Sequence, residues 1–172
     1  FGRPLDKAEL DVYRPLVVQR AKGYSVAAII GHKEFMGLDF LVNEHVLIPR
    51  PDTETLIEDI LALYDVDASP RVLDLCTGPG TILLSLLHYL PNATGVGVDI
   101  SNKALAVAEE NRVSLELADV SRFCESDIKQ LLEQVKVGKG TEYSVLLEAC
   151  KSLFDEKQTF LDGLFDIIVS NP

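Results

Sequence analysis

Short apolar runs alternate with longer amphipathic stretches along the central part of the chain. Residues 71–75, RVLDL, are followed by a glycine turn and then by TILLSLLHYL, whose apolar positions have helical spacing. A second short run, ATGVGVDIS, ends at Asp99, and the alanine-rich NKALAVAEENRVSL follows with Ser101 or Asn102 as its cap. This alternation predicts βαβ units and therefore an α/β fold with a parallel sheet.

The alternation continues less regularly towards the end of the chain. SRFCESD predicts a third strand, and GLFDIIVSNP, with β-branched residues at 167–169, predicts a fourth. Residues 128–161 lie between them and hold two helical stretches broken by VGKGT, which is long for a crossover. We expect 128–161 to be a mostly helical, peripheral insertion.

The N-terminal part has a different pattern. LDKAELDVYRPLVVQRAKG predicts a helix that ends at Gly23, and EFMGLDFLV predicts two short strands joined by a turn at residues 37–39. A further helix should start at Asp52 or Thr53, whose short polar side chains suit a cap, and run to about Asp65. We therefore divide the chain into residues 1–51, a helix, hairpin and linker, and residues 52–172, the main domain.

Composition narrows the class of protein. The chain has 172 residues, 47% of them hydrophobic, which is enough to bury one substantial core. Its apolar runs are short: TILLSLLHYL is interrupted by Ser85 and His88, so we expect no membrane span. The three cysteines, Cys76, Cys124 and Cys150, are widely spaced without a CxxC pair, which argues against a disulfide framework or a zinc site.

The net charge of −11 is unevenly distributed. Residues 1–51 carry seven Lys/Arg and six Asp/Glu, a balance of +1, whereas residues 52–172 carry nine and twenty-one, a balance of −12. Binding to a phosphate backbone draws its affinity from lysines and arginines that displace counterions. The acidic main domain therefore disfavours direct nucleic-acid binding and favours a cationic or protein partner.

The glycine turn DLCTGPG is the first candidate for chemistry. Gly78 and Gly80 stand between a strand and a helix, where a backbone without Cβ lets a ligand approach closely. By itself such a turn is weak support, because a tight turn that binds nothing has the same sequence. Asp99 strengthens the ligand-binding interpretation. This residue ends the next strand, 19 residues after Gly80, which is about where an acidic side chain reaches ribose hydroxyls.

The identity of the nucleoside follows from what the turn lacks. A dinucleotide fingerprint needs a third glycine three residues after Gly80, and Leu83 stands there. A ligand with a ribose but no phosphates suits an acidic rim of Asp74 and Asp99, and the sulfonium cation of S-adenosylmethionine would be favoured by negative charge nearby. Asp74 could also have a purely structural role, as a polar residue that ends a strand.

Asn171 and Pro172 form the second candidate. An isolated Asn-Pro pair usually marks a turn. After a parallel strand, however, the Asn side-chain carbonyl and the adjoining backbone can both accept hydrogen bonds from a substrate NH2 group. Two such acceptors would orient an amide or aryl amine nitrogen, whose lone pair is delocalised, towards an electrophilic methyl group.

Four segments together carry a family resemblance. VLIPRPDTETLIE, VLDLCTGPGTI, GVDISNKALAVAEEN and FDIIVSNP, in this order and spacing, resemble the HemK-type protein-(glutamine-N5) methyltransferases of peptide chain release factors. The likeness runs from GYSVAAIIGHKEFMGLDF onward and leaves much of 128–161 uncovered. It implies a Rossmann-like class I methyltransferase sheet with helices on both faces, S-adenosylmethionine as cofactor, a release factor as protein partner and no metal.

The resemblance also implies roles for individual residues. The implied cofactor-binding residues are Asp74, Thr77, Gly78, Gly80, Asp99 on the ribose, Ile100, and Asp127 near the adenine. Asn171 and Pro172 would begin an Asn-Pro-Pro-Tyr motif that holds the glutamine amide of the Gly-Gly-Gln loop. Arg50 and Pro51 would wall the substrate site, although a rigid proline loop with a helix cap explains them equally well. Pro79 departs from the family's small polar residue between the glycines.

The resemblance leaves alternatives open. It implies more strands than the four counted here, so we expect the sheet to be incomplete at its C-terminal end and this chain alone not to methylate a release factor. An Asn-Pro-Pro-Tyr site also suits the exocyclic amine of adenine, but such an enzyme must extract a base and grip phosphates. A third hypothesis is that the chain is a catalytically silent cofactor-binding or interaction module. DLCTG and the insertion suggest a mitochondrial location, with the cytoplasm as the alternative.

Overall fold

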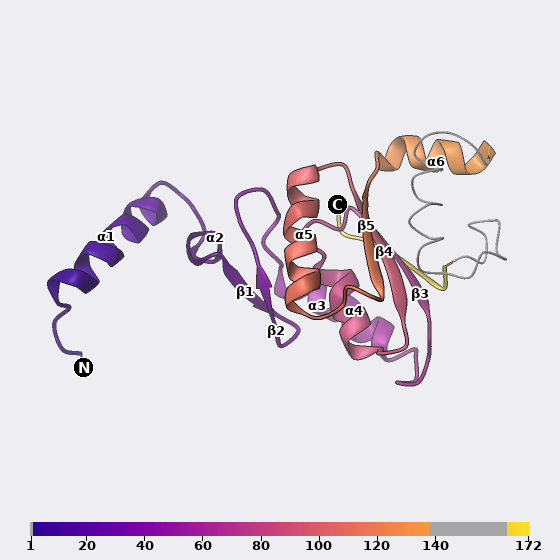
Figure 1. The fold of residues 1–172 in the computed structure, drawn as a ribbon, viewed down its shortest axis with the longest axis horizontal. Helices are drawn as coiled ribbons and strands as arrows, with labels where there is room; N and C mark the ends of the chain where they lie inside the picture. Colours follow the sequence, from indigo (N-terminus) through magenta and orange to yellow (C-terminus); the bar gives the residue numbers. More distant parts are fainter. Residues whose placement is uncertain (1, 138–164) are drawn as a thin grey trace.

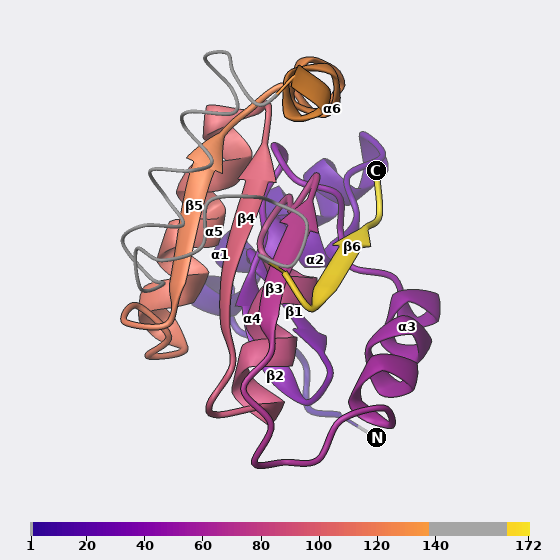
Figure 2. The same cartoon turned by 90° about the vertical axis from the view of Figure 1, so that its right-hand side faces the viewer.

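The computed structural model describes residues 2–137 and 165–172, and a parallel sheet lies at its centre. The strands are β3 (Arg71–Leu75), β4 (Thr94–Asp99), β5 (Ser121–Glu125) and β6 (Ile167–Ser170), in the spatial order β5-β4-β3-β6. Each neighbouring pair is parallel. The predicted α/β fold with four strands is therefore confirmed, and the spatial order brings the last strand beside the first (Figure 2).

Helices pack against this sheet as the alternation predicts. α4 (Thr81–Tyr89) and α5 (Asn102–Ser114) lie on one side of it, and α6 (Ile128–Val137) lies on the other, beyond the end of β5 (Figure 1). Ser101 caps α5, because its hydroxyl accepts from the Ala104 N–H. Val72 and Leu73 point to opposite faces and are 0% and 5% exposed, so β3 is covered on both faces. Most of the predicted insertion, from residue 138 onward, lies outside the described residues.

The hydrophobic core is centred on α4. Residues 81–87 of this helix are all buried between the sheet and the N-terminal hairpin. The hairpin consists of β1 (His32–Phe35) and β2 (Leu38–Leu41), and it contributes Phe35 and Phe40 to the same core cluster as Val72. The hairpin is therefore part of the main core.

The hairpin turn lies earlier than the sequence predicts. Phe35 pairs with Leu38, so the turn is Met36–Gly37 rather than residues 37–39. Both turn residues have positive φ, 52° and 71°, which matches the twist of a two-residue hairpin. The Glu54 carboxylate accepts from the Met36 N–H at 2.9 Å, and the Tyr89 hydroxyl donates to the Met36 carbonyl at 2.6 Å. These two bonds offset the cost of a non-glycine residue in this conformation.

The helix after the hairpin begins and ends earlier than expected. α3 runs from Pro51 to Leu61, and Arg50 at its N-cap makes no side-chain capping bond. Proline starts the helix because its φ is already helical and its missing N–H would have no partner there. Neither Asp52 nor Thr53 is the cap, so that prediction is wrong. The Thr53 hydroxyl is left for a different contact.

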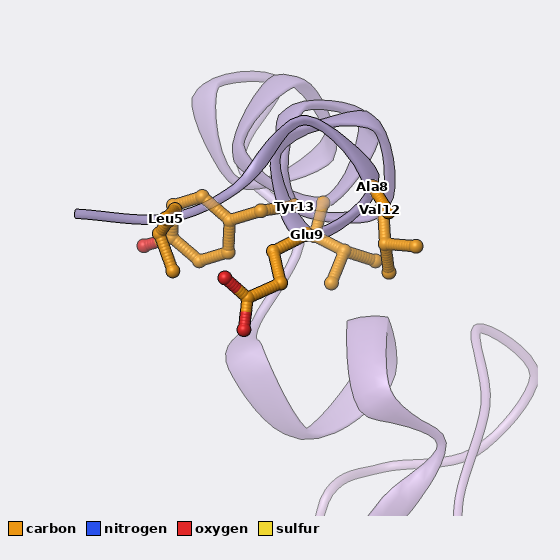
Figure 3. A pocket seen from close by; sticks show the side chains of 6 residues that line it. Leu5, Ala8, Glu9, Val12 and Tyr13 are labelled. Carbon is orange, nitrogen blue, oxygen red and sulfur yellow. The ribbon is translucent and has the colours of Figure 1, made fainter. Parts of the chain in front are cut away.

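The N-terminal helix stands apart from the core. α1 (Lys7–Ala21) has no buried residue, and it extends away from the sheet, followed by α2 (Val26–Ile30) (Figure 1). A hollow of about 720 Å³ runs along α1 and is lined by Leu5, Ala8, Glu9, Val12, Tyr13 and Leu16 (Figure 3). None of the predicted site residues lines it. This hollow along α1 is therefore not the predicted active site.

Candidate active site

The predicted site residues gather at one edge of the sheet. The carboxyl ends of β3, β4, β5 and β6 carry the glycine turn, Asp99, the start of α6 and Asn171, respectively. Parallel strands place their carboxyl ends together, and open α/β sheets bind ligands in the crevice outside them. The sequence separates these segments by up to about a hundred residues, and the sheet brings them to one edge.

The glycine turn is held by hydrogen bonds to the neighbouring strand β4 and back to β3, the strand that leads into it. The Thr77 N–H donates to the Val98 carbonyl at 2.9 Å, and the Thr77 hydroxyl donates to the Asp74 carboxylate at 2.6 Å. Cys76, just before it, has a positive φ of 59°, which is costly for a residue with a Cβ. The turn therefore keeps a strained conformation because its surroundings fix it.

Asp74 is buried beneath the turn and does not form part of a rim. It is 1% exposed, and this burial raises the pKa of its carboxyl to about 7, with the charge of Asp99 adding to the rise. Its Oδ2 accepts from Thr77, while Oδ1 is buried without a hydrogen-bond partner in the described part of the chain. The expected acidic rim is therefore wrong for Asp74, because the strand that carries it is covered on both faces.

The two glycines of the turn differ in their surroundings. A Cβ on Gly80 would lie 2.9 Å from Phe123 Cζ, and its φ of 81° is left-handed. Gly80 is therefore required for the packing of the turn against β5. A Cβ on Gly78 would have no atom within 4 Å, so the space beside that backbone is open. Of the two, only Gly78 leaves room for a ligand against the main chain.

Asp99 is the link between the turn and the next strand. Its Oδ2 accepts from the Gly78 N–H and its Oδ1 from the Ser101 N–H, both at 2.9 Å. Each carboxylate oxygen keeps a further lone pair for a hydroxyl of a ligand. The carboxylate is thus held in one orientation at the edge of the sheet, as a ribose contact requires.

A pocket of about 240 Å³ opens beside Asp99. Its lining residues are Cys76, Val98, Asp99, Ile100, Ser126, Asp127, Ile128 and Lys129. Three predicted cofactor residues, Asp99, Ile100 and Asp127, therefore meet in one cavity, whereas Asp74, Thr77, Gly78 and Gly80 do not line it. Ile100 is 65% exposed and offers an apolar wall.

Asp127 has a structural role at the mouth of this pocket. Its carboxylate accepts from the Lys129 N–H at 2.9 Å and from the Gln130 side chain at 3.1 Å, at the start of α6. These bonds, the one from Lys129 first, lower the pKa of Asp127. An anionic cap at a helix N-terminus is stabilising without a ligand. Its predicted contact with an adenine stays a prediction.

Sequence reasoning missed several pocket residues. Ser126, Ile128 and Lys129 line the cavity because α6 begins directly after β5. Ser126 is 2% exposed, and its hydroxyl has no hydrogen-bond partner among residues 2–137 and 165–172. These three residues could have been found from the sequence, because they come just after a predicted strand and therefore lie at the carboxyl edge of the sheet.

The predicted substrate residues lie at the other side of the same edge. Asn171 follows β6 and its side-chain NH2 donates to the Thr53 hydroxyl at 3.1 Å. Ser170 donates from its hydroxyl to the Leu75 carbonyl at 2.9 Å, which fixes the end of β6 beside the glycine turn. Arg50, Pro51, Asn171 and Pro172 are all exposed. The first turn of α3 therefore lies beside the end of β6. The predicted roles of Arg50 and Pro51 in substrate binding stay predictions.

Residues 67–171 match the sequence model of a family described as "Methyltransferase domain". The chain belongs to this methyltransferase domain family. The match covers the whole parallel sheet and the carboxyl ends of its four strands, where the candidate site lies.

Bacterial relatives extend the likeness beyond that domain. The methyltransferase chain is 39% identical over 174 residues to a release factor glutamine methyltransferase of Bradyrhizobium diazoefficiens, covering 99% of the chain and 49% of the relative. It is 44% identical over 119 residues to the protein of that name from Moorella thermoacetica, covering 69% and 42%. The chain spans about half the length of the curated relatives it matches.

Solved structures confirm the fold. The N-terminal domain of human METTL16 in complex with SAH has a TM-score of 0.56 at 18% identity, covering 99% of this chain and 65% of that one. A SAM-dependent methyltransferase from Agrobacterium tumefaciens has a TM-score of 0.53 at 21% identity, covering 82% and 39%. The Rossmann-like α/β methyltransferase fold is thereby confirmed.

Two further features concern the described residues alone. Among residues 2–137 and 165–172, no helix has the length and apolar character needed to cross a membrane. In the same ranges, no group of three or more His, Cys, Asp or Glu side chains is arranged to hold a metal ion.

Proposed function

We propose that this chain carries the cofactor site and the first part of the substrate clamp of a methyltransferase. The reaction transfers a methyl group from S-adenosylmethionine to the side-chain amide nitrogen of a glutamine in a peptide chain release factor. The observation that carries the proposal is the position of Asn171 directly after β6, beside the glycine turn that follows β3. The names of the relatives, at 39% and 44% identity, supply the substrate class.

The residues present suit S-adenosylmethionine. Asp99 offers oriented carboxylate oxygens for ribose hydroxyls, and Ile100 and Ile128 offer apolar surface for a base. The buried Ser126 hydroxyl, which has no partner in the described residues, suits a polar atom of a ligand in that pocket. Gly78 leaves open space for a ligand along its backbone. When bound, this cofactor supplies the methyl group as an electrophile.

Asn171 would act on the nitrogen that receives the methyl group. An amide nitrogen is a weak nucleophile because its lone pair is delocalised into the carbonyl. The Asn171 side-chain oxygen and a neighbouring backbone carbonyl would accept from the two N–H bonds and hold the nitrogen in one orientation. Holding reacting groups in an aligned arrangement lowers the barrier by several kcal/mol, on the order of 7 or more in favourable cases.

Radiolabelled methyl transfer tests the proposal. The substrates are a release factor, the same factor with its Gly-Gly-Gln glutamine replaced by alanine, and an adenine-containing DNA duplex. The enzymes are this chain and a full-length protein that carries it. We expect label only in the intact release factor and only with the full-length protein.

The substrate controls separate the competing functions. Label in the DNA, or equal label in the alanine-substituted factor, would contradict the proposed substrate. Robust transfer by the 172-residue chain would contradict the expectation that it is inactive alone. The mitochondrial location that the sequence suggests stays a prediction, which imaging of the tagged full-length protein would test.

A further inference from the structure

The contact between Thr53 and Asn171 joins two segments that are 118 residues apart in the sequence. The Asn171 side-chain NH2 donates to the Thr53 hydroxyl oxygen at 3.1 Å. Thr53 lies in the first turn of α3 and Asn171 directly follows β6. Thr53 is half-buried and Asn171 is exposed, so the amide is held from one side and open on the other.

A primary amide presents opposite chemistry at its two ends. Its NH2 group only donates, and its oxygen only accepts. A half-turn of the side chain exchanges the two, so an unrestrained asparagine would offer a substrate NH2 group a donor as readily as an acceptor. With the NH2 group bound to Thr53, the oxygen is the end left for a substrate.

We propose that Thr53 is a positioning residue that sets the amide orientation of Asn171, so that its oxygen faces the substrate nitrogen. The inference rests on the proposed function and deepens it by assigning a role to a residue outside the Asn-Pro pair. Thr53 acts only through Asn171 and does not itself touch the methyl acceptor.

The surroundings of Thr53 make it a firm support. Pro51 starts α3 with a restricted φ, and Ile57 anchors the helix with 0% exposure. The adjacent Glu54 accepts from the Met36 N–H at 2.9 Å, which ties the same helical turn to the hairpin. The helical turn that carries the Thr53 hydroxyl is therefore tied to the core by Ile57 and to the hairpin by Glu54.

Kinetics of the full-length protein form the first arm of the test. Thr53→Val removes the hydroxyl and keeps the shape, and we expect kcat for methyl transfer to fall about tenfold while the Kd of S-adenosylmethionine is unchanged. Thr53→Ser restores the hydroxyl and should restore kcat. Thr55→Val, an exposed threonine on the same helix, is the matched control and should have no effect.

A third substitution tests the direction of the hydrogen bond. Thr53→Asp places an oxygen that only accepts at a position where the helix dipole tolerates a negative charge. It should keep kcat within a few-fold of the serine variant. A threonine that instead donated to the Asn171 oxygen would make the aspartate variant as poor as valine, and that result would overturn the proposal.

The second arm does not depend on activity. In nuclear magnetic resonance spectra of the full-length protein, the Asn171 side-chain NH2 pair is identified by its loss in Asn171→Ala. Thr53→Val should shift this pair and Thr53→Ser should not. An unshifted pair, or unchanged kcat in Thr53→Val, overturns the inference. Wild-type protein that does not label a release factor overturns the proposed function instead, and the spectra still decide the role of Thr53.

Discussion

The two halves of the candidate site are built differently. On the cofactor side, the glycine turn is hydrogen-bonded to Asp74 beneath it and to Asp99 and the Val98 carbonyl on the next strand. On the substrate side, Asn171 is exposed, and the one side-chain hydrogen bond described for it goes to Thr53. The cofactor side is thus fixed by buried and partly buried polar contacts, whereas the Asn171 side chain is held by one exposed hydrogen bond among the described residues.

Because of this difference, we expect substitutions on the two sides to affect different properties of the protein. Changes on the cofactor side should disturb folding and ligand affinity together, because Asp99, the carboxylate that would meet a ligand, also holds the turn. Changes on the substrate side should disturb turnover and leave stability almost untouched, because little is buried there. Each substitution below tests one side of this comparison in the full-length protein.

The largest expected effect is on the substrate side. Asn171→Ala should lower methyl transfer by at least about a thousandfold, because the amide nitrogen of the substrate loses its orientation. The Kd of S-adenosylmethionine and the unfolding midpoint should stay at their wild-type values, as titration calorimetry and urea unfolding would show. Robust transfer by this variant would remove Asn171 from the mechanism.

Asp74 gives the next largest effect, and it depends on pH. Its folded pKa of about 7 lies above the unfolded value of 3.8, so the unfolded chain loses this proton at a lower pH than the folded one. The wild type should therefore lose stability relative to Asp74→Asn as the pH rises from about 4 to 7, by up to about 4 kcal/mol. Above pH 7 the difference should be constant.

Urea unfolding of both proteins without cofactor, from pH 4.5 to 8, measures this difference directly. The paired comparison cancels the titration of other carboxylates. A stability difference between the two proteins that is the same at pH 4.5 and at pH 8 would show that burial does not penalise the Asp74 carboxylate.

Gly80 and Gly78 separate packing from ligand approach within the cofactor side. Gly80→Ala should cost about 2–3 kcal/mol of unfolding free energy, because its Cβ meets Phe123 at 2.9 Å and its φ is left-handed. Gly78→Ala meets no atom within 4 Å and should cost about 1 kcal/mol, from backbone strain alone. Chemical denaturation of the two variants checks the order, and a reversed order would contradict the assignment.

The smallest expected effect concerns affinity. Asp99→Ala should weaken S-adenosylmethionine by at least ~1 kcal/mol through lost hydrogen bonds to the ribose. The Gly78 and Ser101 N–H groups also lose their acceptor, so a small loss of stability accompanies it. Calorimetric titration that finds the wild-type affinity would exclude Asp99 from the cofactor site.

The sequence alone determined the elements whose cause is local. The strand 71–75, the strand that ends at Asp99 and the Ser101 cap all lie where the pattern predicts them. Apolar periodicity and capping chemistry act within a few residues, so they can be read from the chain itself. The candidate residues Asp99 and Asn171 were found in the same way, because Asp99 ends such a strand and Asn171 directly follows one.

Tertiary structure decided the features that depend on distant neighbours. The strand order, the burial of Asp74, and the pocket between Ile100 and Ile128 all require the sheet to be assembled first. The contact of Thr53 with Asn171 spans 118 residues, and no local pattern encodes it. Thr53 looked like a helix cap because its side chain suits one. Pro51 took over the start of the helix, and the hydroxyl became the support of the asparagine at the end of β6.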